Sequence, residues 1–135
     1  QQWKAKTDAL LSKQLEPIRQ NRRFFTVLVK CGIDSAVKSF DDCKMKRPNE
    51  KVFFEESIIA TGYHRLASGN VDEALQLFIL NIRENPESWN AYDSLAEVYM
   101  VKGDKEKAIE MYKKSLLLNP NNENGTMMLK KLEVE

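Results

Sequence analysis

The sequence lacks the features that would place it in several specialised classes of protein. Its 135 residues include five glycines and four prolines, too few for a collagen-like or linker-like chain. No apolar stretch approaches the roughly 20 residues that a helix needs to cross a bilayer. The 21 Lys and Arg residues nearly balance the 20 Asp and Glu residues, which excludes a strongly basic nucleic-acid module and an acidic disordered tail. A chain of this length is expected to form one compact domain.

Residues for metal or cofactor chemistry are also scarce. The chain has two cysteines and a single histidine, His64, whereas a structural zinc site normally takes four ligands. Cys31 and Cys43 are predicted on two antiparallel helices, towards opposite ends of the pair, so we expect free and mostly buried thiols. Neither a P-loop nor a glycine-rich dinucleotide pattern occurs. The sequence therefore predicts no metal and no cofactor.

One short pattern typical of serine enzymes does occur, with Ser35 and Lys38 in an S-x-x-K arrangement. A chain with this many serines and lysines contains such a pair about once by chance, and the S-D-N, K-T-G and G-x-S-x-G patterns are absent. We therefore expect that this chain by itself is not an enzyme.

What the sequence does contain is an internal repeat with a period of 34 residues. Gly69 corresponds to Gly103, and Asn85-Pro86 corresponds to Asn119-Pro120, at this one offset. Between these positions apolar residues recur at helical spacing, and each glycine and proline ends a helix. Each unit is therefore predicted to be a helical hairpin followed by a turn.

This arrangement resembles the tetratricopeptide repeat (TPR), in which small residues allow close helix contact and aromatic residues fill the space between hairpins. Residues 89–122 match the family pattern best; residues 55–88 depart from it at Thr61 and Arg65, where the family prefers Leu and Tyr. The resemblance implies an all-α, right-handed superhelical stack of hairpins that acts as a protein-binding scaffold. It is carried by Tyr92, Leu95, Ala96, Tyr99, Gly103, Ala108, Tyr112 and Pro120, and by Ile58, Gly62, Gly69, Ala74, Phe78 and Pro86.

The flanking segments extend this pattern. Residues 17–50 are predicted to be a degenerate TPR-like hairpin, because Ala36, Phe40 and Pro48 precede their counterparts by a constant 38 residues. Its first helix is expected to start at Pro17, a favoured first-turn position. The residues expected to face inward on that helix are Ile18, Phe25, Leu28 and Val29.

The two ends of the chain are expected to be helical as well. Residues 1–16 are predicted to form a separate amphipathic helix, with Trp3, Leu10 and Leu11 as its candidate anchors. Residues 123–135 are predicted to form a capping helix, because a repeat stack with an open end leaves apolar surface in water. Met127, Met128 and Leu132 are expected to cover that end.

Residues 32–135 are also similar to a repeat tail found in some bacterial serine hydrolases, which are beta-lactamase-like proteins or alpha/beta esterases of the Bacteroidetes type. The runs from Ser88 to Glu97 and from Gly103 to Leu116 carry this similarity. It implies that the chain is a carboxy-terminal appendage of a larger enzyme. It also implies a periplasmic or extracytoplasmic location if that enzyme is exported, and a cytoplasmic one otherwise.

The TPR resemblance implies a concave surface lined by the first helix of each hairpin. Asp93 and Glu97 are four residues apart, so their carboxylates should share one helix face and favour a basic protein or peptide partner. In the competing interpretation, both acids pair with Lys or Arg of neighbouring helices. The predicted lining consists of Glu56, Ile59, Tyr63, Leu66, Asn90, Asp93, Glu97 and Met100.

Other partners remain open at this point. The chain could pack against the upstream domain of its own parent protein or form a homodimer. The alternative function is nucleic-acid or anionic-ligand binding through a basic face made by Arg19, Arg22, Arg23 and Lys30, although four charges make a small footprint for a phosphate backbone.

Overall fold

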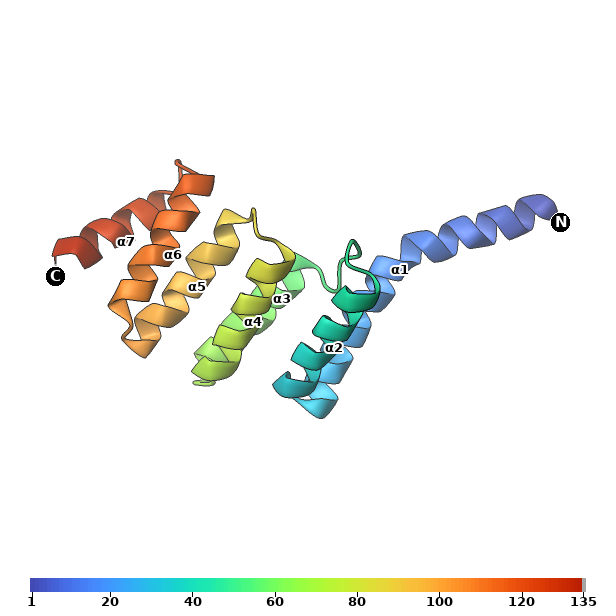
Figure 1. Cartoon of the computed structure of the whole chain (residues 1–135), viewed down its shortest axis with the longest axis horizontal. Helices are drawn as coiled ribbons and strands as arrows, with labels where there is room; N and C mark the ends of the chain where they lie inside the picture. The colour runs from blue at the N-terminus through green and yellow to red at the C-terminus, as the bar shows by residue number, and fades with distance from the viewer. Residues whose placement is uncertain (135) are drawn as a thin grey trace. The chain divides into compact units, whose positions relative to one another are not determined.

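The computed structural model describes residues 1–134, which contain seven α-helices and no β-strand (Figure 1). The predicted all-α repeat architecture is therefore confirmed. The chain divides into two compact units, one from Gln1 to Phe54 and one that begins at Glu55, where the sequence had suggested a single domain. The helices are α1 (Gln2–Cys31), α2 (Ile33–Lys46), α3 (Glu55–Ala67), α4 (Val71–Glu84), α5 (Trp89–Lys102), α6 (Lys105–Leu118) and α7 (Glu123–Val134).

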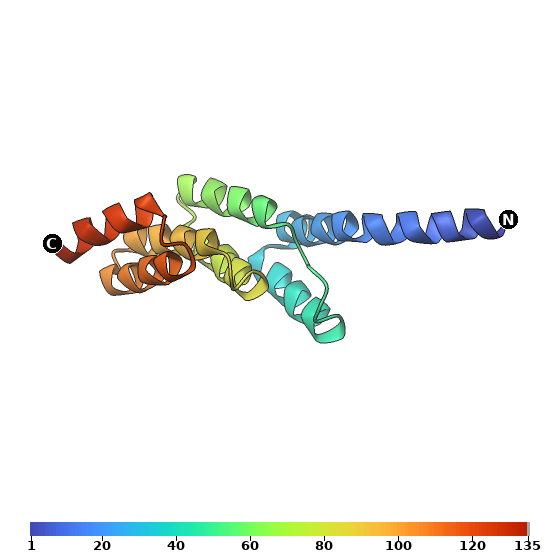
Figure 2. The same cartoon turned by 90° about the horizontal axis from the view of Figure 1, so that it is seen from above.

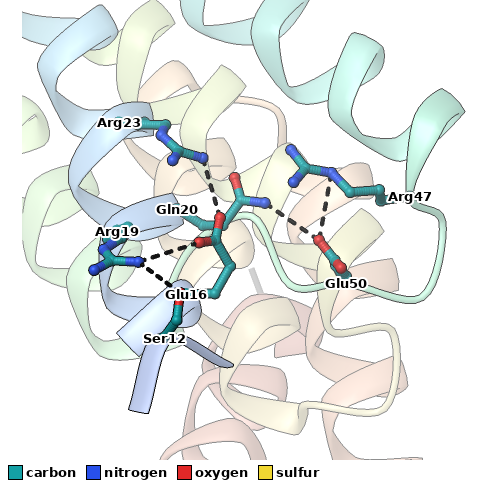
Figure 3. Close-up of polar contacts among 7 residues, drawn as sticks. All are labelled: Ser12, Glu16, Arg19, Gln20, Arg23, Arg47 and Glu50. Carbon is teal, nitrogen blue, oxygen red and sulfur yellow. Dashed lines mark hydrogen bonds and ion pairs between the residues drawn. The ribbon is translucent and has the colours of Figure 1, made fainter. Parts of the chain in front are cut away.

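Helix α1 corrects the prediction that a separate helix ends before Pro17. It runs without interruption for 30 residues, with Pro17 in its interior, and continues well beyond α2 (Figures 1 and 2). A proline inside a helix removes one hydrogen bond and costs about 3 kcal/mol. Side chains on either side of Pro17 offset part of this cost, since Arg19 donates to Ser12 Oγ (3.3 Å) and Arg23 donates to Glu16 (3.2 Å) (Figure 3).

The core of the first unit forms around three phenylalanine rings. The Phe24 and Phe40 rings, from α1 and α2, lie 5.1 and 5.8 Å from the Phe53 ring, which comes from the segment after α2. Leu28 is buried as expected, but Ile18 and Val29 are 47% and 75% exposed. The fully buried ring is Phe24, whereas Phe25, which was expected to face inward, is half-buried and packs edge-on against it with the centroids 5.0 Å apart.

Polar contacts hold the segment after α2 against α1. Asn21 Oδ1 accepts from the backbone N–H of Phe54 at 2.8 Å, and the buried amide of Gln20 donates to Glu50 at 3.3 Å. Arg47 pairs with the same Glu50 oxygen at 3.4 Å (Figure 3). With the Gln20 amide turned the other way, its oxygen accepts from Arg47 instead, at 3.0 and 3.1 Å. This segment thus replaces a regular repeat turn.

Two further expectations for the first unit are wrong. Residues 1–14 are exposed throughout, so Trp3, Leu10 and Leu11 are not anchors, and their exposed fractions are 73%, 57% and 51%. Both cysteines are free, as predicted, but Cys31 is exposed and Cys43 is only half-buried. Cys31 is the last residue of α1, next to the turn at Gly32, so no second helix covers its thiol.

The second unit consists of the hairpins α3/α4 and α5/α6, followed by α7. Where the helices cross, there is room only for small residues. A Cβ on Gly62, for example, would lie 2.3 Å from the Phe78 ring. Gly103 ends α5 with a left-handed backbone conformation that glycine adopts without strain, and Asp104 then caps α6 by accepting from the Lys107 N–H. These local features explain why both hairpins follow the repeat pattern.

Helix α7 packs against α6 at the end of the second unit. Leu132 is buried beside Ala108 and Tyr112, and Met128 and Leu129 pack around it. Met127, which was expected to help cover the end, is 60% exposed. None of the helices within residues 1–134 is both long and apolar enough to span a membrane.

Candidate functional site

The predicted lining residues of α3 and α5 lie at very different depths in the structure. Tyr63 and Glu97 are half-buried, whereas Asp93 is only 6% exposed. Of the remaining residues, Glu56 is exposed, and the half-buried ones are Ile59, Leu66, Asn90 and Met100. The structure therefore brings Tyr63, Asp93 and Glu97 into one polar region, but it does not leave all three equally accessible.

Tyr63 links the two hairpins of the second unit. Its hydroxyl donates to Ser94 Oγ on α5 at 3.1 Å, and its ring packs edge-on against Phe78, with the centroids 5.2 Å apart. Burial raises the pKa of Tyr63 to about 12, and the nearby carboxylates of Glu97 and Asp93 add to the rise. Tyr63 is thus held in one position and stays neutral at physiological pH.

Glu97 is the acidic group of this region that remains partly open to solvent. Burial raises the pKa of its carboxyl above the ordinary value, and the charge of Asp93 contributes in the same direction, while the nearby polar hydroxyl of Tyr63 opposes both. Neither Glu97 nor Asp93 forms an ion pair with any residue in the range 1–134. The interpretation in which both acids are neutralised by Lys or Arg of neighbouring helices is therefore wrong.

Asp93 holds α7 in place. Its two carboxylate oxygens accept from the side-chain amides of Asn122 (2.9 Å) and Asn124 (3.1 Å). Asn122 also donates to Ser115 Oγ (3.0 Å), which in turn donates to the carbonyl oxygen of Trp89 (2.9 Å). This buried network joins α5, α6 and the start of α7, so Asp93, a member of the predicted lining, is bound to α7.

Tyr112 adds a buried hydroxyl to the same region. The side chain is 0% exposed, and its hydroxyl has no hydrogen-bond partner among the residues that the structure describes. Burial raises its pKa, and the charges of Glu97 and Asp93 raise it further. The Tyr112 hydroxyl therefore stays protonated, buried near two carboxylates.

Sequence reasoning missed Ser94, Ser115, Asn122 and Asn124, which organise this region. One signal was available: Asn122 lies 34 residues after Ser88, and both precede a first helix of a hairpin-like pair. Ser88 caps α5 by accepting from the Ala91 N–H, and Asn122 accepts from the Gly125 N–H at the start of α7. The repeat offset thus identifies Asn122 as a capping residue, although it does not predict the contact with Asp93.

The basic face of α1 is partly neutralised within its own unit. Arg19 and Arg23 both lie against Glu16, at 3.9 and 3.2 Å, and Arg19 also donates to Ser12 (Figure 3). Arg22 and Lys30 are exposed. Within residues 1–134, no group of three or more His, Cys, Asp or Glu side chains is arranged to hold a metal ion.

The comparisons with known proteins agree with the repeat architecture. The tetratricopeptide repeat family model matches residues 89–122, the copy with the best sequence pattern. The comparison with curated proteins found no match. The family match and the structural similarities below together support a TPR domain, whereas neither points to a serine hydrolase tail.

Several solved structures share this fold at low sequence identity. The first TPR of Spaghetti (RPAP3), bound to the HSP90 peptide SRMEEVD, is 16% identical with a TM-score of 0.57, covering 87% of this chain and 90% of that one. A MamA mutant is 17% identical with a TM-score of 0.57, covering 84% and 80%. Naa15/Naa10 bound to HypK-THB is 17% identical with a TM-score of 0.57; the match covers 88% of this chain and 17% of that one.

Proposed function

We propose that this chain is a non-catalytic protein-interaction module of the TPR type. It binds a segment of a protein partner on the surface that α3 and α5 form around Tyr63 and Glu97. Two proteins of similar fold were solved with such partners, one with an HSP90 peptide and one with HypK. The sequence identity is too low to carry over a ligand from these proteins. The proposal for this chain is supported instead by its paired repeat hairpins and by the half-buried polar residues Tyr63 and Glu97 between them.

The preferred partner carries a Lys or Arg side chain at the contact. The observation that supports this most directly is the half-buried Glu97 carboxylate, which has no cationic partner within residues 1–134. Desolvation and the nearby charge of Asp93 disfavour its ionised form. A cation from a partner would remove that penalty, because an opposite charge within about 4–6 Å favours the ionised carboxylate.

The residues of the proposed surface have different roles. Tyr63 supplies a rigid, amphipathic contact, and Glu97 supplies the charge. Asp93 is a positioning residue, because it acts through Asn122 and Asn124 on α7 rather than on the partner. The surrounding lining consists of Glu56, Ile59, Leu66, Asn90 and Met100.

The proposed surface can receive a separate protein, a second copy of the chain, or a domain of the same polypeptide. The last source is the one that the sequence resemblance of residues 32–135 to repeat tails of serine hydrolases implies. The full reading frame distinguishes it from the others: an upstream hydrolase domain would make the chain an appendage of that enzyme.

The test uses charge reversal at Glu97 and an array of synthetic 12-residue peptides that carry Lys or Arg in varied positions. We expect Glu97→Lys to weaken the tightest peptides by at least about tenfold, or about 1.4 kcal/mol. The matched control is Glu110→Lys, which makes the same charge change at an exposed position on α6. Equal affinity of the wild type and Glu97→Lys, with an unchanged circular dichroism spectrum, would contradict the proposal.

A further inference from the structure

Asn124 and Gly125 form the single Asn-Gly pair of the sequence, in the first turn of α7. Asparagine before glycine is the dipeptide most prone to spontaneous deamidation, because glycine has no side chain to hinder attack by its own backbone nitrogen. Packing demands glycine at this position: a Cβ on Gly125 would lie 2.8 Å from Asn122 Nδ2 and 3.4 Å from Leu116. The fold therefore retains a chemically labile pair where α7 begins.

We propose that Asn124 is a modification site at which spontaneous deamidation releases α7 from α5. The Asn124 amide donates to Asp93 Oδ2 at 3.1 Å, so it supplies one of the two contacts that tie Asp93 to this helix. Deamidation replaces the donor with a carboxylate that faces the buried carboxylate of Asp93. Asn124 itself is exposed, but Asp93 is only 6% exposed, so two like charges at hydrogen-bonding distance would repel each other with little water around the Asp93 carboxylate.

The chemistry requires only water. The backbone nitrogen of Gly125 loses its proton and bonds to Asn124 Cγ, and the side-chain nitrogen leaves as ammonia, which closes a five-membered succinimide. Water then opens the ring at either carbonyl, giving aspartate or isoaspartate. Isoaspartate also adds a methylene to the backbone, which misaligns the first-turn hydrogen bonds of α7.

The folded state restrains this reaction. The Gly125 N–H donates to Asn122 Oδ1 at 3.2 Å, and Asn122 is itself buried and bonded to Asp93 and Ser115. The nitrogen must leave this hydrogen bond and its helical conformation before it can attack Asn124 Cγ. The reaction rate therefore follows the population in which the start of α7 is open. Deamidation of a molecule removes its Asn124–Asp93 contact, which helps to hold α7 in place. The step is irreversible because the ammonia is lost.

The consequence is a slow, irreversible loosening of the end of the second unit. Leu132, Met128 and Leu129 pack on the cluster that contains Tyr112, and α7 brings all three there. When α7 detaches, this apolar cluster meets water.

The first experiment incubates the full chain at pH 8 and follows the mass increase of about 1 Da by peptide mass spectrometry. We expect the change on the peptide that contains Asn124. Leu132→Ala loosens α7 and should speed the reaction at least about tenfold, which corresponds to a loss of about 1.4 kcal/mol in closing free energy. Modification at other asparagines only, or the same rate in wild type and Leu132→Ala, would overturn the proposal.

The second experiment measures the effect of the product and does not depend on the folding of Leu132→Ala. Asn124→Asp places the carboxylate against Asp93, whereas Asn121→Asp adds the same charge at a neighbouring position, also exposed, whose hydrogen bond is to Asn119 instead. We expect Asn124→Asp to lower the thermal midpoint and to increase amide exchange in α7, with little change in Asn121→Asp. Equal midpoints and equal exchange in the two variants would show that deamidation does not release α7.

Discussion

Two hairpins, α5/α6 in the second unit and α1/α2 in the first, solve the same packing problem in different ways. In α5/α6, small residues and one aromatic residue interlock: Ala96 and Ala108 are 0% exposed against Tyr112. In α1/α2 there is no comparable small residue on α1, and a third ring, Phe53, comes from the segment that follows α2. The regular repeat thus fills its core from its own two helices and the following helix α7, whereas the degenerate hairpin uses a connecting segment without helical structure.

The largest expected effect comes from Tyr112, the buried aromatic residue of the α5/α6 core. Tyr112→Ala should destabilise the second unit by about 3–5 kcal/mol, because a large buried side chain leaves a cavity. Tyr112→Phe should instead be neutral or stabilising, since the hydroxyl that it removes is buried without a partner among residues 1–134. Urea denaturation measures both. A destabilised Tyr112→Phe would show that the hydroxyl has a partner, such as a bound water.

The end of the second unit gives the next largest effect. Leu132→Ala should cost about 2–5 kcal/mol, because this side chain is buried in the core cluster. Met127→Ala should change stability by no more than about 0.5 kcal/mol, because Met127 is mostly exposed. Thermal melts of the two variants rank them directly. Equal losses would mean that Met127 belongs to the cap after all.

A substitution at Gly62 tests whether the α3/α4 hairpin depends on close contact between its two helices. Gly62→Ala should destabilise by about 1–3 kcal/mol, because the added methyl overlaps the Phe78 ring. Phe78→Leu in the same chain should recover part of that loss by making room, although it costs stability alone. A double-mutant cycle measures the coupling between the two sites. Additive effects of the two substitutions would show that the helices move apart instead.

The smallest expected effect is a pH dependence of the polar region. Burial raises the pKa of Glu97 in the folded state, so the folded state holds this proton more tightly than the unfolded state does. Its contribution to stability is therefore present at low pH and is lost as pH rises from its ordinary pKa through the raised one. Glu97→Gln should flatten this part of the stability curve, and chemical denaturation across the acidic range measures it. If Glu97→Gln and the wild type had the same pH dependence of stability, the Glu97 carboxyl would be fully hydrated in the folded state.

The regular parts of the fold could be predicted from sequence, because their constraints are local and repeat. The 34-residue offset identifies the hairpins α3/α4 and α5/α6, and Gly103 and Pro120 mark helix ends. Helix α1 could not be predicted correctly, because Pro17 normally marks a helix start and the contacts that bridge it, from Arg19 and Arg23, depend on side-chain geometry.

The candidate site shows a similar division. Periodicity correctly places Asp93 and Glu97 on the same helix, but it does not predict their burial. The separate roles of the two acids depend on Asn122 and Asn124, which reach α5 only because α7 packs back against the repeat. Such long-range contacts leave no periodic signal in the sequence.

The central claim is that the partner meets the surface around Tyr63 and Glu97. The most direct measurement is an NMR titration of the isotopically labelled chain with the tightest basic peptide from the array. The account predicts that amide shifts concentrate at Tyr63, Ser94 and Glu97, and that they diminish as salt is added. Shifts concentrated instead on the basic face at Arg19, Arg22 and Arg23, with none at Tyr63 or Glu97, would contradict it.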